Sequence, residues 1–208
     1  MHISEGILPW QTLAGGAALT AAGVAIGLKR LKVERVPRVA ALASAFFVAS
    51  LIHVPTFGSS VHLILNGLTG LLLGWAAFPA LLIALGLQAV FFQFGGISTL
   101  GVNTFNMALP AVLCYYLFHR VVAGRSDAAA AAGAFGAGAL SIAFSWGCWA
   151  LALQTAGKPF EGAILLNLFW HLPVMLIEGF VTMSAVAFLR KVRPEMLTPM
   201  HDTFETAV

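Results

Sequence analysis

Apolar residues occur along the chain in long runs separated by short polar or glycine-rich breaks. A helix needs about 20 apolar residues to cross the roughly 30 Å hydrocarbon core of a bilayer. Breaks rich in Gly, Pro, Asn and Ser divide the long uncharged stretch in the middle of the chain. We therefore expect seven membrane-spanning helices, at residues 11–28, 39–55, 60–74, 75–94, 103–122, 128–154 and 163–189.

The run at 60–74 is the shortest of the seven. At about 1.5 Å per residue it covers only roughly 22 Å, so we expect it to be tilted, re-entrant or buried among the other helices. Basic residues support the count, because cytoplasmic loops collect Lys and Arg. With seven spans and the N-terminus outside, ten of the 11 basic residues face the cytoplasm, in the clusters at 29–38, 120–125 and 190–193. We predict an N-out, C-in topology.

Composition defines the class of protein. Hydrophobic residues make up 60% of the chain and charged residues 9%, against roughly 25% charged in an ordinary soluble domain. The net charge of +3 is divided among short clusters, so nucleic acid is not an expected partner. We expect an all-α integral membrane protein with one transmembrane domain at 1–193, including a leader at 1–10, followed by a short cytoplasmic tail at 194–208.

Three common catalytic motifs do not occur in the sequence. The pair Gly157-Lys158 is followed by Pro159 and lacks the earlier glycine of a P-loop, so we expect no ATP hydrolysis by this chain. The sequence also contains no His-Glu-x-x-His and no Gly-x-Ser-x-Gly. We expect a protein that is not an enzyme.

The first two residues, Met1 and His2, carry specific coordination chemistry if the terminal amine is free. The amine, the backbone nitrogen of His2 and its imidazole Nδ1 can bind one metal ion through two fused chelate rings. A fourth nitrogen would complete a square, which is the arrangement that Ni(II) and Cu(II) favour, whereas zinc prefers a tetrahedron. Met1 and His2 are therefore candidate metal ligands.

A fourth nitrogen is available from the polar breaks. The leader can extend up to about 33 Å, which would let it reach inward to the turn at 57–62, where His62 is the candidate; a helix-start residue bonded to a loop carbonyl is its alternative role. His53 is expected to be a structural or supporting group. The polar segment at 94–107 could cap the same cavity, with side chains that orient the ligands: Ser98, Thr99, Asn103 and Asn106.

His171 and Glu178 lie within the last apolar run, seven residues apart, and therefore on roughly one face of a helix. We expect a buried hydrogen-bonded pair that fixes helix packing; a proton relay is the alternative. If these two groups carried coupling protons, the chain would be a stand-alone metal permease. An intramembrane metalloenzyme is a third possibility.

Several ordered motifs resemble one family. They are the start Met-His-Ile-Ser-Glu-Gly at 1–6, Gly-Ser-Ser-Val-His at 58–62, the Gly-Gly-x-Ser-Thr-Leu-Gly-x-Asn-x-x-Asn-Met-Ala run at 95–108, and Glu178-Gly179. Together they are similar to the CbiM/NikM family, the substrate-binding membrane components of energy-coupling factor transporters for cobalt and nickel. The resemblance covers essentially the whole chain.

The resemblance implies a fold, a ligand set and partners. The fold would be a six-helix core with one extra N-terminal helix. The ligands of the transported Co²⁺ or Ni²⁺ would be the amine of Met1, the backbone and side-chain nitrogens of His2, and the side chain of His62, with no organic cofactor. The partners would be a membrane coupling subunit, a pair of cytoplasmic ATPase subunits and a small separate membrane accessory subunit, assembled in the cytoplasmic membrane of a prokaryote.

Overall fold

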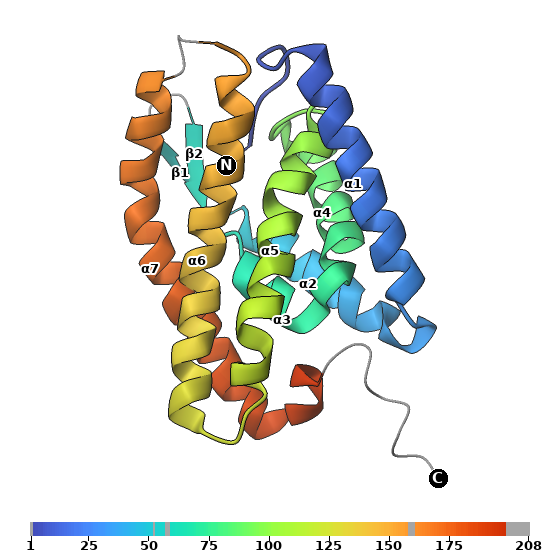
Figure 1. Cartoon of the computed structure of the whole chain (residues 1–208), viewed down its shortest axis with the longest axis vertical. Coiled ribbons are helices and arrows are strands. Elements are labelled where there is room, and N and C mark those ends of the chain that lie inside the picture. The colour runs from blue at the N-terminus through green and yellow to red at the C-terminus, as the bar shows by residue number, and fades with distance from the viewer. Residues whose placement is uncertain (1, 52, 57–58, 158–160, 199–208) are drawn as a thin grey trace.

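In the computed structural model the chain is predominantly helical (Figure 1). The structure describes residues 2–51, 53–56, 59–157 and 161–198, without the side chains of 53–56, 59–62, 161 and 163. These residues form seven α-helices: α1 Trp10–Arg30, α2 Val36–Ala49, α3 Asn66–Leu73, α4 Ala77–Phe92, α5 Leu100–Val122, α6 Asp127–Gln154 and α7 Glu161–Val192. Short 3-10 helices lie at Val33–Arg35, Gly74–Ala76 and Pro194–Leu197.

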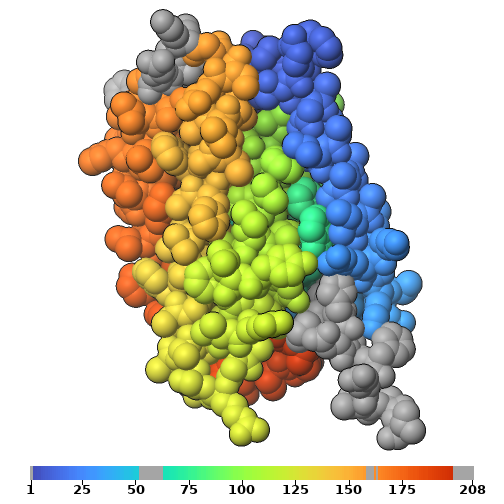
Figure 2. Space-filling view, viewed as in Figure 1, coloured from blue at the N-terminus to red at the C-terminus, as the bar shows by residue number. Residues whose placement is uncertain are grey.

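Four single helices are long and apolar enough to cross a bilayer, α1, α5, α6 and most of α7. A fifth apolar stretch of sufficient length, Asn66–Phe92, is divided between α3 and α4. Their outward side chains are apolar as well, for example Leu117 on α5, Leu151 on α6 and Phe188 on α7. Lipid is the solvent that suits such a surface. Figure 2 shows the outer surface of α5 lying between those of α1 and α6.

A β-hairpin replaces part of two predicted spans. The predicted helix at 39–55 ends at Ala49, and β1 follows at His53–Thr56. The predicted helix at 60–74 is also wrong, because β2 occupies Ser59–His62 and α3 begins only at Asn66. Pro55 has no N–H to donate within a helix, and the β-branched residues Val54, Thr56 and Val61 favour extended backbone. As expected for this region, α3 is buried along nearly its whole length.

The hairpin brings two histidine positions together. β1 and β2 are antiparallel, and their register pairs His53 with His62 and Val54 with Val61. Directly opposed residues in such a ladder have Cα atoms about 4.5–5.5 Å apart. In the view of Figure 1 the hairpin is seen through the gap between α6 and α7, in the half of the molecule that also holds the start of α1. β2 packs against α7.

The chain reverses direction between α3 and α4. Gly74 has a φ of +53°, which a side chain would disfavour. α3 packs against α5 and α6, and a Cβ at Gly67 would lie 2.6 Å from the Cα of Gly138. The absence of that Cβ lets α3 approach the backbone of α6. α4 then runs back along α2 and α5.

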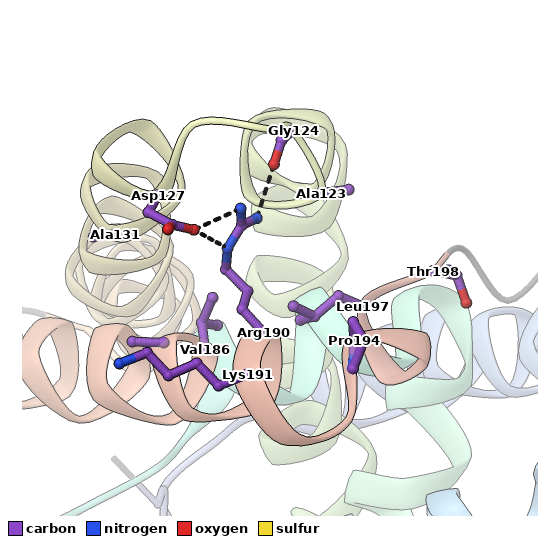
Figure 3. A pocket seen from close by; sticks show the side chains of 11 residues that line it. Ala123, Gly124, Asp127, Ala131, Val186, Arg190, Lys191, Pro194, Leu197 and Thr198 are labelled. Atoms are coloured by element: carbon purple, nitrogen blue, oxygen red, sulfur yellow. Dashed lines mark hydrogen bonds and ion pairs between the residues drawn. The ribbon is translucent and has the colours of Figure 1, made fainter.

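The three basic segments share one end of the molecule. In Figure 3, Arg190 of α7 reaches into the loop between α5 and α6. It donates to Asp127 at 2.9 Å and to the carbonyl oxygens of Val122 and Gly124 at 2.7 and 2.8 Å. Arg38 at the start of α2 donates to the carbonyl of Met196. Because Lys and Arg collect on the cytoplasmic side, the N-out, C-in orientation predicts that this common end faces the cytoplasm.

The orientation can be tested by cysteine labelling in a background that lacks Cys114 and Cys148. We expect Lys32→Cys and Ala123→Cys both to react with a membrane-impermeant maleimide in inside-out vesicles and to be protected in intact cells, because both loops lie at the basic end. Labelling of the two positions from opposite sides would overturn the topology.

Candidate metal centre

The N-terminal leader, residues 2–9, turns into the helical bundle instead of lying along its surface. Ile3 is 2% exposed and Leu8 is also buried. Asn103 of α5 holds the leader through both ends of its amide: Oδ1 accepts from the backbone N–H of Ile3 at 2.9 Å, and Nδ2 donates to the carbonyl of Ile3 at 3.0 Å. This bidentate contact fixes the position of the residue that follows His2.

The polar segment before α5 supports this contact. Nδ2 of Asn103 also donates to the Thr99 hydroxyl at 3.2 Å, and that hydroxyl donates to the carbonyl of Gly96 at 3.3 Å. The backbone N–H of Ser98 donates to Oε1 of Glu5 at 3.1 Å. Three of the four polar residues predicted here, Ser98, Thr99 and Asn103, therefore contact the leader or a group that holds it.

Asn106 lies elsewhere. It is buried, and together with Thr12, Gly16 and Cys148 it lines a groove of about 440 Å³ between α1, α5 and α6. Its Nδ2 has no hydrogen-bond partner among the described residues. The structure therefore places Asn106 at this groove, and not among the groups that hydrogen-bond the leader in the described part of the chain.

The predicted ligands are described to different degrees. His2 is half-buried, and its ring stacks on Phe94 with centroids 6.1 Å apart. The backbones of His53 and His62 are opposite each other in the hairpin, whereas their side chains, and all of Met1, lie outside the described part of the chain. The described residues alone contain no group of three His, Cys, Asp or Glu side chains that could hold a metal ion.

His171 and Glu178 do not form the predicted pair. Nδ1 of His171 donates to the carbonyl oxygen of Asn167, one turn earlier, at 2.7 Å. The carboxylate of Glu178 accepts from the backbone N–H groups of Ile64 and Leu65, the latter at 2.9 Å. Each group is buried and has its own partner, so the pair interpretation is wrong for this fold.

Sequence reasoning missed two supporting interactions of this region. Glu178 binds the segment that joins β2 to α3, and Asn66, the first residue of α3, donates to the Ser145 hydroxyl on α6 at 2.9 Å. The sequence offers one indication of these interactions: a carboxylate at membrane depth is costly and therefore requires hydrogen-bond donors nearby. The sequence does not show that backbone N–H groups more than 110 positions away supply them.

Membrane-length helices around a buried, histidine-bearing leader and a histidine-bearing hairpin define an integral membrane protein with a candidate metal centre. The family described as "Cobalt uptake substrate-specific transmembrane region", CbiM, matches residues 2–196. The chain belongs to the CbiM family and is a membrane component of cobalt or nickel transport.

Individual relatives agree with this assignment. A Haemophilus influenzae protein whose name assigns it to metal transport is 43% identical, with 95% of this chain and 97% of the relative covered. Cobalt transport protein CbiM of Sorangium cellulosum is 34% identical, with coverage of 95% and 94%. A solved structure titled as a transition metal transporter has a TM-score of 0.72 and 27% identity, covering 92% of this chain and 93% of its own.

The role of Asn103 can be tested without metal. Asn103→Ala removes two hydrogen bonds from Ile3, each worth about 0.5–1.5 kcal/mol. A loss of about 2 kcal/mol corresponds to roughly 30-fold faster local opening. We expect hydrogen exchange at the Ile3 amide to accelerate by about that factor, measured by mass spectrometry of the purified protein.

Asn106→Ala is the matched control, because it removes a buried asparagine from the same helix that forms none of the described hydrogen bonds to the leader. Equal acceleration in both variants would show that Asn103 has no special hold on the leader.

Proposed function

We propose that this chain is the substrate-specific component that captures Co²⁺ or Ni²⁺ outside the cytoplasmic membrane of a prokaryote and delivers it inward as part of an ATP-driven importer of the energy-coupling factor type. The observation that carries the proposal is the inward course of the leader, tied to α5 at Ile3. It brings the backbone of the second residue into the bundle, where a bound cation would be shielded from water.

The ligand set that we propose is the amine of Met1, the backbone nitrogen and Nδ1 of His2, and the side chain of His62. Four nitrogens suit the tetragonal preference of Ni(II), and Co(II) accepts the same donors. Two supports come from the described residues: His2 is half-buried against Phe94, and His62 lies at the end of a strand that enters the bundle beside α7. The names of relatives include both cobalt and nickel transport.

Energy would come from other chains. The sequence contains no P-loop, so in this proposal two cytoplasmic ATPase subunits act through a membrane coupling subunit, and a small separate membrane protein is the accessory. The permease alternative assigned coupling protons to His171 and Glu178. In the fold these groups are bonded to backbone groups and not to each other.

Uptake that requires the ATPase subunits would support the importer, and uptake without them would support the permease.

The terminal chelate can be tested by extending the chain. One added residue before Met1, or acetylation of its amine, removes a donor nitrogen and moves His2 out of chelate register. We expect tight Ni²⁺ and Co²⁺ binding to be lost in calorimetric titration, while membrane insertion and thermal stability are retained because every helix is intact.

The matched control is the same chain with its extension removed by a protease that restores Met1 as the first residue. Equal affinity before and after cleavage, with the same absorption spectrum of the bound Ni²⁺, would exclude the terminal chelate.

The fourth ligand can be tested by comparing the two hairpin histidines. Only His62 is proposed to bind the cation, so His62→Ala should weaken Ni²⁺ binding severely, by roughly 100-fold or more, and His53→Ala by much less. Binding should also weaken as the pH falls, since imidazoles with a reference pKa of about 6.5 must be unprotonated to coordinate. Equal losses of affinity in the two variants would show that His62 is not the fourth ligand.

A further inference from the structure

Glu178 is a carboxylate in the middle of α7, a helix whose described part is long and apolar enough to cross the membrane, and it is 0% exposed. A carboxylate at this depth is costly unless its oxygens have partners. Among the described residues it is the only fully buried Asp or Glu, and no described Lys, Arg or His forms an ion pair with it. The groups that do stabilise it therefore indicate its role.

Those groups are the backbone N–H groups of Ile64 and Leu65. Leu65 donates to both carboxylate oxygens, at 2.9 and 3.1 Å, and Ile64 donates to Oε1. Leu65 is the N-cap of α3, with a φ of +54° and no side-chain cap of its own. The first N–H groups of a helix lack partners within the helix and carry its positive dipole end. Glu178 supplies an acceptor for Leu65 at this helix end and for Ile64, which precedes the helix.

The position of Glu178 is itself fixed by packing. Gly138 of α6 lies so close to α7 that a Cβ there would be 2.8 Å from the carbonyl carbon of Glu178. On the other side of the junction, Asn66 donates to Ser145 of α6. The segment at 64–66 is therefore held by α7 through Glu178 and by α6 through Ser145.

His62 is two residues before Ile64, at the last position of β2. Two residues of extended chain span at most about 7 Å, so the anchored N–H of Ile64 restricts where the backbone of His62 can lie. Its cross-strand partner is His53, in a hairpin of four residues per strand, and isolated two-stranded hairpins are marginally stable in water. Here β2 packs against α7, which helps to give the hairpin a defined position.

We propose that Glu178 is a positioning residue of the cation site: it holds the exit of β2 so that His62 meets the cation together with the N-terminal chelate. The proposal rests on the proposed function and deepens it. A carboxylate suits this role because two oxygens accept from two neighbouring N–H groups. Glutamine has one acceptor oxygen and would turn an NH₂ group toward a backbone donor.

The test is a double-mutant cycle with Ni²⁺ on the purified full chain with its native first residue. Glu178→Gln should lower Ni²⁺ affinity by about 10–100-fold, the usual effect of losing a group that orients a ligand. If Glu178 acts through His62, the same substitution in a His62→Ala background should cause little further loss. Thr182→Val, a buried polar residue one turn along α7, is the matched control and should bind normally.

Two further measurements separate positioning from simple loss of fold. X-ray absorption of Ni²⁺ bound to Glu178→Gln should show one imidazole fewer than in the wild-type protein, and hydrogen exchange should accelerate at Ile64 and Leu65. If Glu178→Gln does not fold, Glu178→Asp keeps the charge on a shorter side chain and should show the same changes to a smaller degree.

The outcomes are distinguishable. Wild-type protein that does not bind Ni²⁺ or Co²⁺ would overturn the proposed function, and this inference with it. Tight binding by the wild type with full affinity and an unchanged imidazole count in the Glu178 variants would overturn only the positioning role. Losses that add fully in the double variant would do the same, because they would show that Glu178 acts independently of His62.

Discussion

Every backbone N–H and C=O group at membrane depth needs a hydrogen-bond partner, and this requirement governs the whole fold. Helices satisfy it internally, but the leader and the hairpin exit do not. Where they enter the bundle, side chains of the surrounding helices accept or donate for them. Asn103 takes both polar groups of Ile3, and Glu178 takes the N–H groups of Ile64 and Leu65.

The molecule therefore has two parts, a scaffold of long helices and the irregular segments that these two contacts hold. The long helices form the scaffold, closed at the basic end by Arg190, which bonds to the loop between α5 and α6. The irregular segments, which carry the proposed cation ligands, lie inside it toward the other end (Figure 1). The proposed chelate needs a backbone nitrogen that is free of helical hydrogen bonds, and a non-helical segment held by a buried side chain provides it.

Membership of the CbiM family agrees with this division, because the match extends over residues 2–196 and includes both the scaffold and the irregular segments. The fold is shared at a TM-score of 0.72 with a transition metal transporter. The irregular course of the leader explains the presence of the polar residue Asn103 in an apolar helix. Its amide has one donor end and one acceptor end, and the backbone of a single residue, Ile3, offers the complement.

The sequence by itself determined the class of protein and the apolar runs of α1 and α4 to α7. It also indicated two sets of candidate residues, Met1-His2 in the leader and the polar segment at 94–107. These are local properties: hydropathy, run length and the chemistry of neighbouring donors. It predicted helix where the hairpin lies, because a short apolar run bounded by Pro and Gly has no periodicity that separates strand from buried helix. Only the tertiary structure decided that His53 opposes His62, that Asn103 holds Ile3 and that Glu178 binds Ile64 and not His171. The contacts of Asn103 with Ile3 and of Glu178 with Ile64 join residues 100 or more positions apart, and the strand pairing depends on a register that local hydropathy does not show.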